Sequence, residues 1–247
     1  MKRSLKTLID YKIQTTDQVE GKINDFLFDE KSWVIRYMKS DFGNFISPQK
    51  VLVPQVFLES PNWHDHSFPI EISSKEIDRC PDIEEHQTVS RKYEELLFEH
   101  YDLKPYWYSA YTVPIASSFY PPRPLKTPTK NIEEENIDTI LRSFEEVKGY
   151  HIQAIDGKIG HIEDLIIDDD DWQIVYVVID TSNWLPWSKK VLIAIDWMDN
   201  ISYEKREVKI SLHKDAIKNA PEYDESQTID ELFEKSMYDF YSLSLVK

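Results

Sequence analysis

Two stretches of the sequence carry residues that could bind a metal ion, and the first is a histidine pair. His64 and His66 flank Asp65. Alternate residues of an extended segment point to the same side, so the two imidazoles could share one ion. We expect an exposed loop at these residues, with metal binding as the weaker alternative.

The second stretch is the run of four aspartates at Asp168–Asp171, whose carboxylates are typical ligands of a hard cation. A calcium loop needs glycine at its sixth position and glutamate at its twelfth. Counted from the first aspartate, these positions hold Gln173 and Ile179, so the run does not fit a calcium loop. We interpret it as a polar turn, because β-rich runs lie on both sides of it.

Recognisable catalytic motifs are missing from the sequence. It contains no nucleophile elbow, phosphate-binding loop or zinc motif, and five glycines leave little room for backbone-cradled phosphates. Asp25 and Asp29 recur as Asp164 and Asp168, but hydrogen-bonded turn aspartates explain this spacing more simply than acid–base chemistry does. We therefore predict no catalytic residue, no cofactor and no resident metal, with an enzyme or metal-binding protein as the alternative.

The charge and the apolar content restrict the class of protein. Of 247 residues, 41% are apolar, and 45 acidic against 29 basic residues give a net charge of −16. That charge repels phosphate backbones and anionic membranes, so we expect no direct contact with nucleic acid. The longest wholly apolar run, Ile174–Ile179, is far shorter than the roughly 20 residues of a membrane helix. The basic N-terminal residues are not followed by the apolar stretch that a secretory signal needs. Cys80 is the only cysteine, which fits a reducing compartment. The short apolar runs and the single cysteine together predict a soluble cytoplasmic protein without a membrane span.

The sequence repeats itself once. Thirteen residues between Ser4 and Asp41 recur 139 positions later, and eleven more between Lys50 and Tyr101 recur 140 positions later. Self-similarity of this extent indicates two homologous units. We place the first unit at residues 1–101, a linker at 102–138 and the second unit at 139–247.

Within each unit the apolar pattern predicts short strands. They are expected at residues 11–15, from 21 onward, 33–37, 50–54 and 68–72, and again at 150–154, from 160 onward, 172–179, 190–194 and 207–212. Short strands separated by turns, with no crossover helices, indicate a small antiparallel barrel or sandwich. An amphipathic helix ends each unit, at residues 88–101 and 228–241. The predicted fold class is therefore mainly β with helices (α+β).

Aromatic side chains mark the candidate interaction surface. Six of the thirteen prolines fall between Pro105 and Pro128 of the linker, interleaved with aromatic residues that a solvated linker would not need. We expect these residues to cement the two units, with a ligand-binding groove as the alternative. The residues assigned to a protein interaction are Tyr106, Trp107, Tyr108, Tyr111, Trp184 and Trp187.

The repeated pattern resembles the PRC-barrel family. The residues that carry the resemblance are EGKINDFLFDEKSWVIRY followed by KVLV in the first unit, and GHIEDLIIDDDDWQIVYVVIDTSNWLPWSKKVLIA in the second. The family is named for the photosynthetic reaction-centre H subunit and includes the C-terminal domain of a ribosome-maturation factor. The resemblance implies two tandem small antiparallel β-barrels of PRC type, each followed by a C-terminal amphipathic helix, that act as a protein-interaction or assembly module.

Neither known context of the family transfers directly. The membrane helix of the H subunit has no counterpart here, and a second barrel stands in place of the other N-terminal domain of the maturation factor. We therefore expect a non-catalytic binding module for a protein partner, or a peripheral subunit of a ribosomal or membrane-associated complex that contacts protein. The two units are expected to pair within one chain like a fused homodimer, with pairing between two chains, as a homodimer, as the alternative.

Overall fold

A computed structural model describes residues 1–43, 49–81, 83, 89–108, 141–181 and 189–245. The first half of the chain contains β1 (Lys2–Ser4), α1 (Leu5–Ile9), β2 (Lys12–Gln14), β3 (Glu20–Asp29), β4 (Ile35–Asp41), β5 (Lys50–Pro54), β6 (Ser67–Pro69), α2 (Ser74–Arg79) and α3 (Arg91–His100). The second half contains β7 (Leu141–Ser143), α4 (Phe144–Val147), β8 (His151–Ala154), β9 (Gly157–Asp168), β10 (Gln173–Asp180), β11 (Lys190–Ala194), β12 (Met198–Ser202), β13 (Glu207–Ile210), α5 (Lys214–Asn219) and α6 (Glu231–Leu245). Three short 3-10 helices follow β5, α3 and β11, at Gln55–Phe57, Tyr106–Tyr108 and Ile195–Trp197.

The strands form two sheets, one for each half. The first has the order β5-β4-β3-β2-β6, and the second has the order β11-β10-β9-β8-β13-β12. The mainly β fold with helices is therefore confirmed. The prediction of purely antiparallel barrels is wrong at one pair in each sheet, because β2 with β6 and β8 with β13 run parallel. Long connections rather than hairpins join these pairs, which permits parallel pairing, and neither order of described strands closes into a ring.

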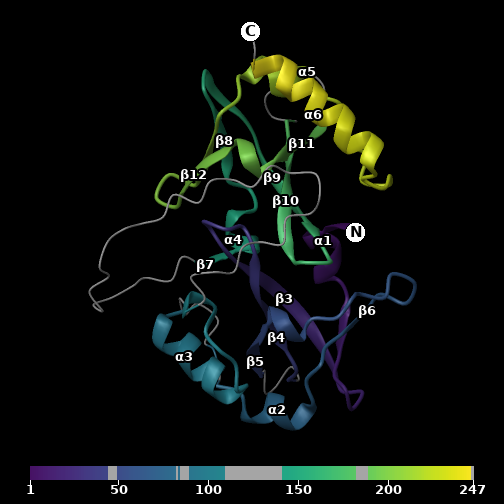
Figure 1. Cartoon of the computed structure of the whole chain (residues 1–247), viewed down its shortest axis with the longest axis vertical. Coiled ribbons are helices and arrows are strands. Elements are labelled where there is room, and N and C mark those ends of the chain that lie inside the picture. Colours follow the sequence, from purple (N-terminus) through teal and green to yellow (C-terminus); the bar gives the residue numbers. More distant parts are fainter. Residues whose placement is uncertain (44–48, 82, 84–88, 109–140, 182–188, 246–247) are drawn as a thin grey trace.

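The N-terminal strand and helix of each half lie on the sheet of the other half. β1 pairs with the end of β9, and β7 pairs with the end of β3. In Figure 1 the purple α1 accordingly lies beside the green strands of the second half. The exchange is not predictable from the sequence, because three-residue strands carry too short an apolar pattern to be recognised.

The exchange explains why the long strands lose their alternating pattern. In β3, residues 20–25 alternate between exposed and buried, whereas Phe26 to Asp29 are all buried. β9 changes in the same way, with Leu165 to Ile167 buried in succession. A continuous apolar run is typical of a strand covered on both faces, and the exchanged strand and helix lie against this part of each long strand.

The two halves meet about a pseudo-twofold axis. Val34 forms an isolated bridge with Gln173, which is its own counterpart in the repeat. On either side, the N–H of Ile35 donates to the carbonyl of Trp172 at 2.9 Å, and the N–H of Ile174 donates to the carbonyl of Trp33 at 2.8 Å. Equivalent residues thus exchange equivalent hydrogen bonds, which is the geometry of an isologous contact.

The longer helices lie at opposite ends of the molecule (Figure 1). α3 and α2 cover the far end of the first sheet, and α6 covers the far end of the second. Met237 and Tyr241 of α6 are buried, as are Leu97 and Phe98 of α3. Among the described residues, no helix combines the length and the apolar character that crossing a membrane requires.

Candidate functional site

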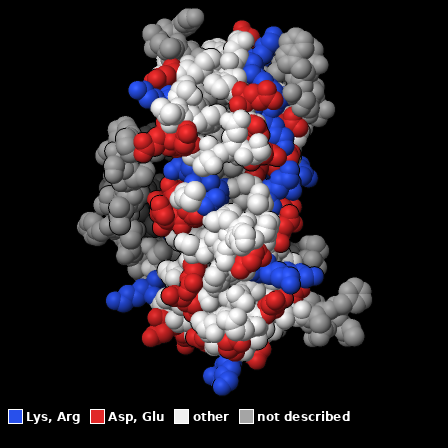
Figure 2. Space-filling model, turned by 90° about the vertical axis from the view of Figure 1, so that its right-hand side faces the viewer, with Lys and Arg blue, Asp and Glu red and all other residues white. Residues whose placement is uncertain are grey.

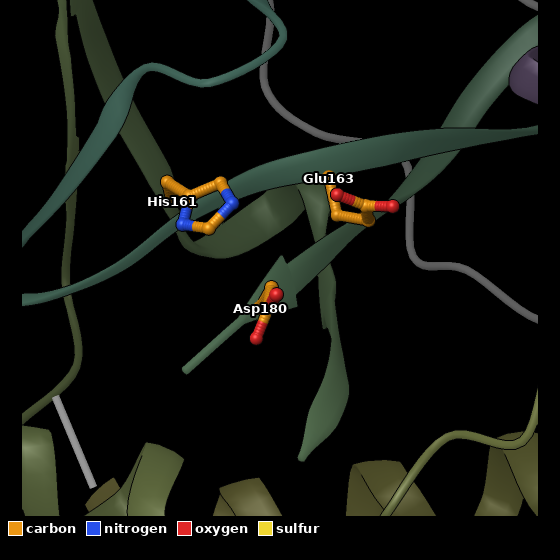
Figure 3. Close-up of side chains that lie close together, drawn as sticks. All are labelled: His161, Glu163 and Asp180. Atoms are coloured by element: carbon orange, nitrogen blue, oxygen red, sulfur yellow. The ribbon is translucent and has the colours of Figure 1, made fainter. Parts of the chain in front are cut away.

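Three side chains of the second half place metal-ligating atoms together on one face of the sheet. His161 and Glu163 are two residues apart on β9 and therefore point to the same side. Asp180 of β10 is the register partner of His161. One ligating atom from each of the three residues lies within 4.8 Å of the other two. Figure 3 shows His161 and Glu163 projecting from one strand and Asp180 from its neighbour.

Gly160 allows β9 and β10 to approach each other beside this cluster. Its φ of +71° lies in the left-handed region that favours glycine. A Cβ at this position would overlap the carbonyl oxygen of Asp180 and lie 2.8 Å from Cγ2 of Ile179. The glycine therefore fixes the backbone next to two of the three candidate ligands.

Two lysines hold Glu163 in its charged form. Lys6 of α1 binds Oε1 of Glu163, and Nζ of Lys190 lies 3.4 Å from the same oxygen. Burial raises the pKa of Glu163, but the hydrogen bond from Lys6 and the charges of both ammonium groups outweigh burial, so the pKa falls below its usual range. Lys190 also lies 2.6 Å from Oε1 of Glu225, so it has a second acceptor.

His161 is half-buried, and within the described part of the chain no hydrogen bond or ion pair involves its ring. A second imidazole, that of His151, stands across from it in the register of β8 and β9. An imidazole with two carboxylates is a nitrogen–oxygen ligand set that suits zinc and other first-row transition metals and leaves coordination positions open for water. Beside Lys190, residues 222–225 and 227 line a hollow of about 640 Å³ together with Lys189.

The first half has different residues at the same positions. Lys22 and Asn24 replace His161 and Glu163, and only the aspartate is retained, as Asp41. Lys22 and Asp41 are register partners in β3 and β4, as His161 and Asp180 are in β9 and β10. The backbone frame is therefore repeated, whereas the ligand set is found in one half only.

A second group of carboxylates, Asp168 to Asp170, also lies close together. These residues contact the exchanged N-terminal segment: Lys2 lies 2.6 Å from Asp168, Arg3 lies 3.3 Å from Asp169, and the amino group of Met1 contacts all three aspartates. The run is thus a turn, as predicted, and three cations already neutralise it. The corresponding pair across the axis is Arg142 with Glu30, at 2.7 Å.

Two buried aspartates cap the exchanged helices. Asp164 accepts hydrogen bonds from the hydroxyl of Ser4 and the backbone N–H of Lys6. Burial raises the pKa of Asp164 to about 6, although these donors and the adjacent N–H of Leu165 oppose the rise. The carboxylate that recurs at equal spacing is therefore a helix cap at this position, and acid–base chemistry is not needed to explain it.

Asp25 does the same in the first half. It accepts hydrogen bonds from the hydroxyl of Ser143 and the backbone N–H of Glu145, the positions equivalent to those that Asp164 contacts. Burial raises the pKa of Asp25 as well. Each half therefore binds the strand and helix of the other half through the same carboxylate.

The histidine pair predicted as a weak metal candidate forms a turn. Asp65 accepts hydrogen bonds from the N–H and hydroxyl of Ser67, at 3.1 and 2.7 Å. The ring of His66 packs on Tyr11, with centroids 4.9 Å apart. His64, Asp65 and His66 are not in either group of metal-ligating atoms found among the described residues.

The first aromatic residues of the linker pack onto α3. The hydroxyl of Tyr106 donates to Oε1 of Glu94 at 2.8 Å, and the guanidinium of Arg91 lies 3.8 Å from the ring centre of Trp107. Burial raises the pKa of Glu94, and the hydrogen bonds and nearby arginine charges oppose this rise. The side chain of Tyr108, and Tyr111, Trp184 and Trp187, lie outside the described residues.

The cluster of His161, Glu163 and Asp180 was not predicted from the sequence, because a turn separates Asp180 from the other two residues. Two signals were available. The strand HIED places an imidazole and a carboxylate at alternating positions, and the repeat replaces a lysine of the first unit by His161. Only the strand register shows that Asp180 joins them.

The comparisons with known proteins identify a family in the second half of the chain. The family model of the PRC-barrel domain matches residues 141–217, from the start of β7 into α5. No curated protein matches the chain. This part of the second half is therefore a PRC-barrel domain, as the resemblance of the sequence indicated. The unit boundaries at residues 101 and 139 stay predictions.

Proposed function

We propose that the chain is a non-catalytic protein-interaction or assembly module made of two PRC-barrel domains. The PRC-barrel domain matched at residues 141–217 supports the class of module. A second such domain at residues 1–101 is supported by the sequence repeat and by the recurrence of the strand pairings, helix caps and cation–acid contacts in both halves.

The observation that carries this proposal is the exchange itself. Each sheet receives a strand and a short helix from a distant part of the chain, through backbone pairing and one capping carboxylate. Addition of a strand to a sheet is a common mode by which protein modules bind peptides. Each half thus already binds a protein segment, and a module of this kind suits assembly with other proteins.

Charge supports a protein partner rather than nucleic acid. The net charge of −16 opposes contact with phosphate backbones. On the face shown in Figure 2, acidic and basic side chains are interspersed, so this face offers no field of one sign. We therefore favour apolar and aromatic contact with the partner, and propose Trp107, which is half-buried on α3, as one contact residue.

Affinity purification of the cross-linked, tagged chain from its native host tests the proposal. We expect one stoichiometric protein partner whose recovery survives high salt, because aromatic contacts are little affected by screening. Trp107→Ser should reduce that recovery. Leu232→Ser is the matched control, since Leu232 of α6 is the most exposed large apolar residue described, at 78%. Recovery of the tagged chain alone, or equal losses in both variants, would contradict the proposal.

A further inference from the structure

We propose that His161, Glu163 and Asp180 bind one divalent first-row transition-metal ion, with Zn²⁺ as the representative ion. The three side chains come from adjacent strands, point to the same side of the sheet and have ligating atoms within 4.8 Å of one another. Metal binding here does not depend on the identity of a protein partner.

The distances allow coordination with small side-chain movements. Ligands about 2.1 Å from a tetrahedral zinc ion lie about 3.4 Å from one another, so atoms separated by 4.8 Å or less need to converge by roughly 1.5 Å at most. A change of this size is within the reach of side-chain rotation, and the strand register keeps the three Cα positions fixed.

The imidazole is the observation that separates this cluster from a charged surface. In the described part of the chain, His161 is half-buried and its ring takes part in no hydrogen bond or ion pair. Its nitrogen is therefore available to a metal without loss of an existing contact. An imidazole ligand also favours zinc, nickel or cobalt over magnesium and calcium, which prefer oxygen alone.

The two lysines on Glu163 compete with the ion and do not block it. Both contact Oε1, and no described group is hydrogen-bonded to Oε2 of Glu163. Lys190 already lies closer to Glu225, at 2.6 Å, than to Glu163, at 3.4 Å. Lys6 is the main competitor, and it belongs to the exchanged helix α1. Removal of its charge should therefore strengthen metal binding.

Isothermal titration of the full chain with ZnCl₂ tests the site, and titration with MgCl₂ serves as the contrasting ion. We expect one saturable Zn²⁺ equivalent and no saturable binding of Mg²⁺. His161→Lys, which introduces the residue of the first half at this position, and Asp180→Asn should each weaken the binding of Zn²⁺ at least tenfold. Lys6→Gln should tighten it several-fold, a gain that general damage to the fold would not produce.

Control variants address the other candidate sites of the chain. His64→Gln with His66→Gln, and separately Asp170→Asn, should leave the affinity for Zn²⁺ unchanged. Thermal unfolding without metal should show His161→Lys as folded as the parent chain. Absence of saturable Zn²⁺ binding by the parent chain, full affinity in His161→Lys, loss of affinity in either control, or unchanged affinity in Lys6→Gln would each overturn the proposal.

Discussion

The two halves of the chain agree at the hydrogen bonds that hold the exchanged helices and differ at the candidate metal cluster. Asp25 and Asp164 cap the exchanged helices through equivalent hydrogen bonds, and Trp33 and Trp172 offer equivalent carbonyls across the axis. By contrast, Lys22 occupies the position of His161. Residues that recur therefore maintain the exchange, and residues that depart from the repeat are the first candidates for a function of one half.

An equivalent carboxylate contacts the sheet from the C-terminal helix of each half, but the surroundings of the two carboxylates differ. Glu94 of α3 is fully buried and accepts from the hydroxyls of Tyr37 and Tyr106, with Arg91 at 3.0 Å. Its counterpart, Glu234, accepts a hydrogen bond from Tyr176 at 2.6 Å, but its side chain is 22% exposed. Equivalent positions thus carry the same carboxylate in different dielectric surroundings, so they should respond differently to mutation.

Substitution of the recurring glycine should give the largest difference between the halves. Gly160→Ala places a Cβ against the backbone carbonyl of Asp180 at a φ of +71°, and we expect it to lower the free energy of unfolding by about 5 kcal/mol. In Gly21→Ala the obstacle is the ring of Phe42, which can rotate away, so the loss should be about 1 kcal/mol. Denaturant unfolding followed by tryptophan fluorescence measures both, and equal losses would contradict the comparison.

Removal of the helix carboxylates should give the next largest difference. Glu94→Ala leaves the hydroxyls of buried Tyr37 and half-buried Tyr106 without their acceptor and removes the ion pair with Arg91. We expect a loss of about 4 kcal/mol in the free energy of unfolding. Glu234→Ala removes one hydrogen bond and a 3.8 Å ion pair with Lys2 at a partly exposed position, so we expect about 1 kcal/mol. Chemical denaturation of both variants under identical conditions checks the ratio. A larger loss in Glu234→Ala would show that burial does not set the strength of this contact.

The capping aspartates should make stability depend on pH. The pKa of Asp164 is raised to about 6 in the folded chain, from 3.8 for an unperturbed side chain. Because the folded state holds this proton more tightly than the unfolded state, the stabilisation is complete below about pH 4 and is lost as the pH rises through about 6. The total change is roughly 3 kcal/mol.

Asp164→Asn isolates this effect, because an amide can keep an acceptor toward the backbone N–H groups but cannot ionise. Relative to the parent chain, the variant should gain roughly 3 kcal/mol between pH 3.5 and pH 7.5, measured by urea unfolding at a series of pH values. Asp25→Asn should change in the same direction, since burial raises the pKa of Asp25 too. A parallel pH dependence in the parent chain and the Asp164→Asn variant would refute the role of this carboxylate.

The sequence predicted the longer strands well because each has a buried side with a clear period. β5 and β11 lie at the predicted positions, and β4 and β10 follow the recurring tryptophans closely. The repeat also indicated the PRC-barrel domain that the family model matches. What the sequence could not show is which sheet receives β1 and β7, because the two sheets offer equivalent apolar positions to a three-residue strand.

The candidate metal cluster was only partly predictable for a related reason. His161 and Glu163 are visible as alternating residues, but Asp180 joins them through strand register, which depends on the bulges between β9 and β10. The histidine pair at His64 and His66 met the same alternation rule and instead forms a turn held by Asp65. Alternation in sequence is therefore not sufficient evidence for a shared site, because a turn breaks the extended geometry on which it depends.

The smallest expected difference concerns the cations that anchor the exchanged strands. The guanidinium of Arg3 lies 3.6 Å from the ring centre of Trp63, and that of Arg142 lies 3.6 Å from the ring centre of Tyr203, its counterpart. Tryptophan presents the stronger π face, so a double-mutant cycle to alanine should give a coupling of about 1 kcal/mol for the first pair and about 0.5 kcal/mol for the second. The cycles are measured by denaturant unfolding at low salt. A stronger coupling at Tyr203 would mean that the carboxylate beside each arginine determines the strength of these anchors. That carboxylate is Asp169 beside Arg3 and Glu30 beside Arg142, and Glu30 lies closer to its arginine than Asp169 does.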